Sequence, residues 1–274
     1  MVLARTVTVS TDAGGAADGA NVAFLRAVDS IAEVGHGLTV RAGALGGVTF
    51  AGPVGDSFSE RPGFLTVAPG GGFTSVAASV RTIGDQTFGQ RVRLDNQAGF
   101  ISGGIVSFAG ALEAGPWNAL IRAAEIDFLG PVSGSATLAL EADDPLRDIE
   151  LAGAATGDQL NLTSQELERI EDGFAFVTYG GEDGAAELLI ADDLLLLDDT
   201  ELRMPMAGGK IRSPGILRGT PGTRILITGP GSTFETGGGI ITHGGAIEIR
   251  DGVRLLAGAV LDTTNGGAAP AGAT

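Results

Sequence analysis

The sequence contains no cysteine, few aromatic residues and few basic residues. Its 274 residues include one Trp, one Tyr and 12 Phe, and 17 Lys and Arg stand against 33 Asp and Glu, so the formal net charge is −16. Without cysteine, a disulfide scaffold, a cysteine-ligated zinc finger and a thiol enzyme are excluded. Nucleic acids and anionic membranes both attract basic surfaces, so the acidic composition argues against these two partners.

Long hydrophobic runs are also missing. No stretch approaches the ~18 uninterrupted apolar residues of a membrane-spanning helix, and the most notable apolar run is the four leucines at 194–197. Residues 1–10 alternate polar and apolar side chains, whereas a secretory leader has a basic start and an apolar run. We therefore expect a strand here, in a chain cut from something longer. Because 43% of the residues are hydrophobic, the chain can bury a core and disorder is not expected.

Glycine is abundant. It provides 46 of the 274 residues, more than twice the ordinary share of ~7%. Gly, Asp, Asn and Pro separate short runs that alternate polar and apolar residues, as at 6–10, 38–41, 91–94 and 225–228. A period of two is typical of β-strands, and the intervening segments are too short for crossover helices. This pattern leaves open an antiparallel sandwich or barrel and a parallel solenoid.

Internal similarity favours the solenoid. Segments that end a strand on Phe, turn at Gly and continue on an aliphatic residue recur around Phe50, Phe108 and Phe128. Their separations of 58 and 20 residues fit three rungs and one rung of a coil of about 20 residues. A sandwich has no reason to repeat such a unit in register, so we predict a parallel β-helix.

A longer similarity links the two ends of the sequence. Residues 9–20 resemble residues 261–273, and Gly14 matches Gly266 at an offset of 252 positions. Self-similarity at a fixed period is typical of repeat architectures. We therefore predict that residues 1–274 form a single β-helix segment, approximately one ~252-residue unit of a tandem array.

One segment, near 163–172, departs from the strand pattern. Thr163 and Glu166 have the spacing of a capping box, and acidic residues fill the first turn, where the helix dipole favours them. These features predict a helix of about two turns. Because so short a helix is not stable alone, we expect Leu167 and Ile170 to pack onto the solenoid.

Three stretches resemble the repeat regions of filamentous-haemagglutinin-like exoproteins and related giant bacterial adhesins: residues 7–24 with the strand at 38–40, residues 83–94, and residues 160–174. The second is similar to the recurrent coil G-x-Q-T-[YF]-x-G-x-V-x-L of that family, and the third to its L-x-L-T-x-x-E-L…L-x-D-G-F element. The resemblance implies a right-handed parallel β-helix on an exported fibre, with an adhesive or structural role. The family's secretion domain, anchoring barrel and translocation signal have no counterpart here, so export is implied for the parent protein.

Parallel β-helices also include polysaccharide hydrolases, so catalysis has to be considered. Polygalacturonase-like hydrolases carry Asn-Thr-Asp, Asp-Asp, Gly-His-Gly and Arg-Ile-Lys in that order. This sequence has Gly-His-Gly at 35–37, Asp pairs at 143–144 and 192–193, and the reversed Lys-Ile-Arg at 210–212, but no Asn-Thr-Asp. Nothing in this order places two carboxylates at a fixed separation in one cleft, which glycoside hydrolysis requires. We predict no catalytic residue.

A metal site is not expected either. The Asp pairs at 192–193 and 198–199 flank the leucine strand, so an extended chain separates them by about 13 Å or more, too far for one calcium ion. His36 and His243 are the only histidines, and two histidines do not complete a catalytic metal site without carboxylates. We predict solvated turn acids, turn or surface histidines, no metal and no cofactor.

The remaining motifs favour structural roles. The glycine triplets at 70–72 and 237–239 lack the Gly-Lys-Ser/Thr of a phosphate loop and predict turns. Trp117 either stacks on carbohydrate or caps a coil, and the second role is favoured. A further helical turn is expected at 120–124.

These observations predict a non-enzymatic structural or adhesive repeat module of a long bacterial cell-surface or extracellular fibre. Its expected partners are neighbouring repeats end to end and surface glycans or other cells, with no nucleic acid and no membrane insertion by this segment. One alternative is a β-helix module that binds a glycan or a protein, which exposed aromatic or Asn ladders would favour. The other is a polysaccharide lyase or hydrolase, which a groove with clustered carboxylates and a basic residue would favour.

Overall fold

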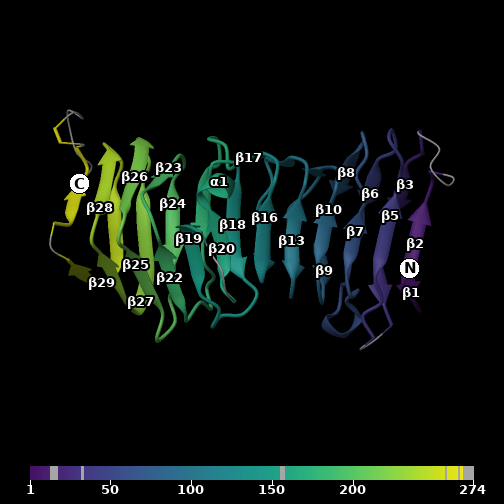
Figure 1. The fold of residues 1–274 in the computed structure, drawn as a ribbon, viewed down its shortest axis with the longest axis horizontal. Coiled ribbons are helices and arrows are strands. Elements are labelled where there is room, and N and C mark those ends of the chain that lie inside the picture. The colour runs from purple at the N-terminus through teal and green to yellow at the C-terminus, as the bar shows by residue number, and fades with distance from the viewer. Residues whose placement is uncertain (13–17, 32–33, 155–157, 257, 265, 268–274) are drawn as a thin grey trace. The chain divides into compact units, whose positions relative to one another are not determined.

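The computed structural model describes residues 1–12, 18–31, 34–154, 158–256, 258–264 and 266–267. Its contacts divide the chain into two compact units, Met1–Ala136 and Thr137–Thr274. Each unit is an all-β parallel solenoid, and the chain has about 11 turns. Strands of successive turns lie side by side within each unit (Figure 1). The predicted parallel β-solenoid is therefore confirmed, whereas Gly14 of the long repeat lies outside the described residues.

Three ladders of parallel strands form the sides of the first unit. The first ladder consists of β2 (Val7–Ser10), β5 (Leu38–Arg41), β7 (Leu65–Val67), β10 (Gln86–Phe88), β13 (Ile105–Phe108) and β16 (Glu125–Phe128). The second consists of β3 (Val22–Phe24), β6 (Val48–Phe50), β8 (Phe73–Val76), β11 (Arg91–Leu94), β14 (Leu112–Gly115) and β17 (Val132–Gly134). The third consists of β9 (Val80–Thr82), β12 (Ala98–Ser102) and β15 (Ala119–Ala123). The short β1 (Val2–Leu3) pairs with β4 (Asp29–Ser30), and η1 (Phe58–Glu60) is a 3-10 turn.

Alternate residues of each strand point into the core of the first unit. Phe88, Phe108 and Phe128 occupy the same register position on β10, β13 and β16. Their rings stack with centroids 5.4 and 5.9 Å apart, and Phe100 of β12 meets the first two edge-on. Such aromatic pairs contribute about 0.5–1.5 kcal/mol beyond their burial. The predicted placement of Phe108 and Phe128 on neighbouring rungs is confirmed.

Phe50 does not belong to this stack. It lies on β6 in the second ladder and pairs in register with Phe24 and Val76. Phe50 and Phe108 are three turns apart, as predicted, but they do not occupy equivalent positions, because they lie in different ladders. The assumed coil of 20 residues is present only in the later turns of the unit, because the loops between the earlier strands are longer.

The motif at 83–94 has a clear structural meaning. Gln86 points into the core, where its Nε2 atom donates to the backbone oxygens of Val80 at 3.1 Å and of Ile101 at 2.9 Å. Thr87 faces outward and Phe88 inward, as the strand period of two requires. The buried amide therefore ties β10 of the first ladder to β9 and β12 of the third.

The segment 120–124 is a strand and not the predicted helical turn. Strand β15 pairs with β12 in register, with Ala119 beside Ala98. Ala119, Ile121 and Ala123 are buried and the two residues between them are partly exposed. This alternation has the period of a strand, so the prediction from local composition was wrong.

The second unit also has three ladders, and two long strands each contribute to two of them. The first ladder consists of β18 (Thr137–Ala142), β21 (Phe176–Tyr179), β24 (Thr200–Arg203) and the first halves of β27 (Ile225–Thr236) and β29 (Ile247–Leu255). The second consists of β20 (Leu160–Thr163), β19 (Ile149–Gly153), β22 (Glu187–Ile190), β25 (Lys210–Ser213) and the second halves of β27 and β29. The third consists of β23 (Leu194–Leu196), β26 (Ile216–Pro221), β28 (Gly239–His243) and β30 (Val260–Asp262).

The predicted helix is present but shorter than expected. Helix α1 (Ser164–Leu167) is one turn long and has the predicted capping box: the N–H of Glu166 donates to Thr163, and the Glu166 side chain accepts from the N–H of Thr163 at 2.9 Å. The N–H groups of Arg169 and Ile170 then donate to carbonyl oxygens three residues earlier. These tighter bonds end the α-helix, and Leu167 and Ile170 are buried as predicted.

Glycines allow successive turns to approach closely. Gly19 in the first unit and Gly239 in the second have φ of +57° and +97°. A Cβ atom on Gly19 would lie 1.9 Å from the carbonyl oxygen of Ala42, and one on Gly239 would lie 2.0 Å from that of Val260. Both the positive φ and the contact with the next turn therefore require glycine.

Candidate functional site

Carboxylates at the turns bind backbone N–H groups of the adjacent turn. This holds for both units, and the distances between the Oδ1 atom and the backbone nitrogen are 2.8–2.9 Å: Asp85 with Ile105, Asp148 with Glu187, Asp193 with Ile216, and Asp199 with Arg224. The acids at 193 and 199 were predicted to be solvated turn residues. They are turn residues, and each also satisfies a backbone donor of the next turn.

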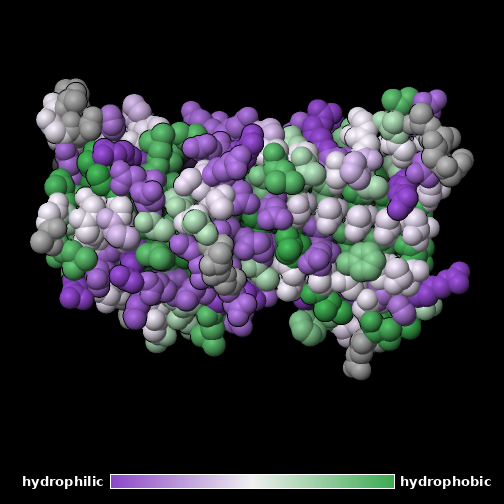
Figure 2. All heavy atoms as spheres, viewed as in Figure 1, coloured by the Kyte–Doolittle hydropathy of each residue, from purple (hydrophilic) through white to green (hydrophobic). Residues whose placement is uncertain are grey.

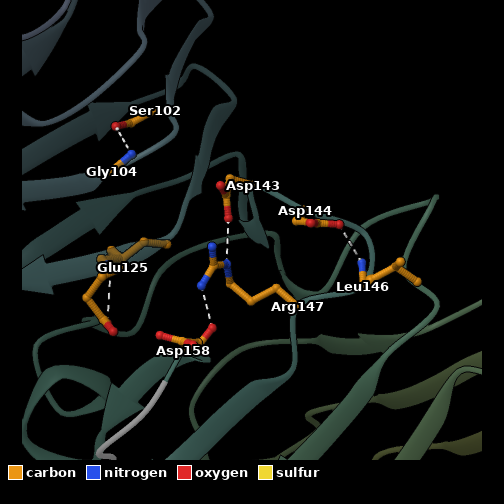
Figure 3. Close-up of polar contacts among 9 residues, drawn as sticks. Ser102, Gly104, Glu125, Asp143, Asp144, Leu146, Arg147 and Asp158 are labelled. Carbon is orange, nitrogen blue, oxygen red and sulfur yellow. Dashed lines mark hydrogen bonds and ion pairs between the residues drawn. The ribbon is translucent and has the colours of Figure 1, made fainter.

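The first Asp pair, Asp143 and Asp144, lies in the loop between β18 and β19, and both carboxylates accept hydrogen bonds from that loop (Figure 3). Nε of Arg147 lies 2.7 Å from Oδ1 of Asp143, and its Nη1 atom donates to the backbone oxygen of Asp158. Oδ1 of Asp144 accepts from the N–H of Leu146 at 2.9 Å. Because Arg147 holds one carboxylate and the loop backbone holds the other, the two are not arranged as a general acid and base.

Asp198, which follows strand β23, is buried, so the prediction that it is a solvated turn acid is wrong. Asp198 is only 8% exposed, and its Oδ1 atom accepts from the N–H of Gly173 at 2.9 Å, whereas its Oδ2 atom is buried without a hydrogen-bond partner. Burial raises the pKa of Asp198, and the nearby Asp172 carboxylate raises it further, while the bond from Gly173 opposes the shift. Burial also raises the pKa of Tyr179 above its ordinary range. The adjoining cavity of about 20 Å³ has room for about one water molecule, so this cluster is not a substrate site.

The outward face of the first ladder carries a column of hydroxyl groups. Its members occupy one register position on five successive strands: Thr8, Thr39, Thr66, Thr87 and Ser107. Figure 2 shows a band of pale side chains, neither strongly hydrophilic nor hydrophobic, over these strands. Thr is favoured in strands because its branched side chain suits the pleated surface, so this hydroxyl column has a sufficient explanation in the fold.

The outward face of the second ladder of the second unit is charged and hollow. A groove of about 480 Å³ is lined by six polar side chains of four successive strands, which we call the charged groove: Glu187, Lys210, Arg212, Thr233, Glu235 and Arg254. Hydrophilic side chains gather over β22, β25 and β27 in Figure 2. The volume is within the range of small-ligand sites. The reversed Lys-Ile-Arg motif is part of this groove, with Lys210 and Arg212 exposed and Ile211 buried.

Two ion pairs order the charged groove. Nη1 of Arg212 lies 3.0 Å from Oε1 of Glu187, and Nη1 of Arg254 lies 3.2 Å from Oε2 of Glu235. Lys210 makes no ion pair with any described residue, so the groove carries one uncompensated positive charge. Sequence reasoning noted Lys210 and Arg212 but missed the two glutamates and Arg254. Only the register of the strands brings these residues together.

The other singled-out residues lie apart from this groove. The backbone N–H of His36 donates to Oγ of Ser30 at 2.9 Å in a turn of the first unit, and His243 ends β28 in the second. The triplet at 70–72 lies in a bend before β8, and the triplet at 237–239 runs from a bend into β28, whose first residue is Gly239. The side chain of Trp117 is 38% exposed, and its backbone N–H donates to the carbonyl of Ala114 at 3.2 Å.

Across the described ranges, no group of three or more His, Asp or Glu side chains is arranged to hold a metal ion. In the same part of the chain, no helix is long and apolar enough to cross a membrane.

Comparison with known proteins found no matching family, no matching curated protein and no matching solved structure.

Proposed function

We propose that the chain is a non-enzymatic structural and adhesive module of a long bacterial cell-surface or extracellular fibre, joined end to end to neighbouring repeats. The observation that carries this proposal is the exposed apolar edge of the second unit along β29 and β30. Among the described residues, strand β30 pairs with β28 alone, and β29 pairs with β27 alone. Large apolar side chains are exposed along this edge: Val253, Leu255, Leu256, Val260 and Leu261.

An open edge of this kind is a template for another strand. Unpaired N–H and C=O groups together with exposed apolar side chains favour pairing with a further chain segment. In solenoids each repeat is covered by its neighbour. A following repeat would therefore bury these side chains and continue the ladders, which is the arrangement that a tandem fibre requires.

Hydrogen exchange in a chain carrying this sequence twice in tandem tests the proposal. We expect the amides of β29 and β30 in the first copy to exchange more slowly than in the single chain, because the second copy covers them. Leu261→Lys should remove this gain, since it places a charge at the covered edge. Leu146→Lys is the matched control, because Leu146 is 74% exposed in a loop. Unchanged exchange of β29 and β30 in the tandem chain would contradict the proposal.

The charged groove favours a second candidate, a polysaccharide-acting module. It combines carboxylates with basic residues, as a lyase or hydrolase would need. However, each carboxylate forms an ion pair with an arginine, and this pairing supports binding over cleavage. We expect no new reducing ends and no unsaturated products when the protein is incubated with oligogalacturonides. Steady release of either product would replace the structural function by an enzymatic one.

A further inference from the structure

Lys210 is the one cation of the charged groove that no described residue neutralises. It is exposed on β25, between Glu187 and Thr233 of the neighbouring strands in register, yet it forms no ion pair with a described residue. It is also the only lysine in the sequence. Because the two arginines are already held by glutamates, a ligand with one negative group would meet its strongest partner here.

The rest of the lining indicates what else the ligand carries. The carboxylates of Glu187 and Glu235 accept hydrogen bonds and repel anions, so a simple phosphate or sulfate would use only part of the groove. A sugar acid supplies both a carboxylate for Lys210 and several hydroxyl donors for the glutamates. Among the residues that the structure describes, no apolar side chain lines the groove to receive those of a peptide.

The spacing of the lining residues suits a chain of such sugars. The lining side chains repeat from strand to strand at the interstrand distance of ~4.8 Å, which is about the length of one pyranose unit in an extended chain. The net charge of −16 does not prevent the approach of an anion, because charges beyond ~8 Å are largely screened at physiological ionic strength. The local charge of the groove therefore decides binding.

We propose that the charged groove binds a uronic-acid saccharide, with Lys210 facing the carboxylate and Glu187 and Glu235 accepting from sugar hydroxyls. The proposal rests on the adhesive function proposed above and names the chemical class of its partner. Recognition uses charge and hydrogen bonds without an aromatic platform, so the affinity should fall as the salt concentration rises.

Titration calorimetry of the full chain with short oligogalacturonides tests this proposal. We expect saturable binding to one site and a loss of about 10-fold or more in affinity for Lys210→Gln, because a charge-assisted hydrogen bond is removed. The Lys210 side chain forms no ion pair or hydrogen bond with a described residue, so this variant should melt like the wild type. Arg218→Gln is the matched control: it removes one exposed arginine of β26 outside the groove, and its affinity should be unchanged.

Two further probes separate the alternatives. Neutral galacto-oligosaccharides of the same length and a poly-glutamate peptide should each bind at least about 10-fold more weakly. Absent binding of oligogalacturonides, equal binding of the neutral sugar or of the peptide, or equal losses in Lys210→Gln and Arg218→Gln would overturn the proposal. None of these outcomes affects exchange at β29 and β30, so failure here is distinguishable from failure of the proposed fibre function.

Discussion

The two units share one architecture but differ in the polar groups that they bury. Among the described residues of the first unit, every buried polar side chain is uncharged: Ser30, Thr74, Ser75, Thr82, Gln86, Gln90 and Ser102. The second unit buries three carboxylates, Glu141, Asp198 and Glu201. Individual outward ladders also differ: the hydroxyl column lies on the first ladder of the first unit and the charged groove on the second ladder of the second unit, although the first unit also has exposed ion pairs, such as Arg91 with Glu113.

This difference separates what the fold requires from what it leaves free. Inward positions at one register must be apolar or internally hydrogen-bonded, because a buried polar group without a partner is costly. Outward positions only have to suit a strand, so one unit can repeat threonines where the other places ion pairs. Functional chemistry can therefore change along a solenoid without changing its core.

The largest expected effect is the contrast between an inward and an outward neighbour on β13. Phe108→Ala removes the middle ring of the stack and should lower the free energy of unfolding by about 3–5 kcal/mol, through lost burial and the cavity left behind. Ser107→Ala, one residue away on the outward face, should change it by about 0.5 kcal/mol or less. Urea denaturation of the two variants checks this. Similar losses of unfolding free energy for both variants would mean that the hydroxyl column also stabilises the fold.

The inward pattern was largely predictable from the sequence, and the outward sites were not. Three signals of the sequence are present in the structure: the period-two runs, the placement of Phe108 and Phe128 on neighbouring rungs, and the capping box at Thr163. Phe50 was misplaced because the turns vary in length, and equal spacing in sequence then does not mean equal register. The charged groove joins Lys210 to residues 23 to 44 positions away, which only the strand pairing defines.

A smaller effect on stability, which depends on pH, should come from the buried carboxylate of Asp198 in the second unit. Because burial raises the pKa of Asp198 above its unfolded value, its contribution to stability is complete below the unfolded pKa of ~3.9 and is lost as the pH rises through the folded pKa. Asp198→Asn keeps an oxygen for the N–H of Gly173 but does not ionise. Thermal melts should therefore show this variant gaining stability relative to the wild type between acidic and neutral pH.

The matched control for this measurement is Asp193→Asn. Asp193 is an exposed turn acid that also accepts a backbone N–H of the next turn, so its variant shows what removing an exposed carboxylate does at each pH. If the difference between Asp198→Asn and the wild type is constant with pH, the buried carboxylate does not distinguish the second unit.

The smallest effects compare the two outward faces directly. Double-mutant cycles on Glu235 with Arg254 and on Thr66 with Thr87, each pair neighbouring in register, should both give coupling energies of about 0.2–1 kcal/mol. The ionic pair is exposed on the arginine side, so its coupling should shrink at 1 M salt, where the screening length falls to ~3 Å. The threonine coupling should not change. If the coupling energy of the charged pair did not depend on salt, packing between the aliphatic parts of the two side chains would account for it. The two outward faces would then differ only in the chemistry of the ligands that they could bind.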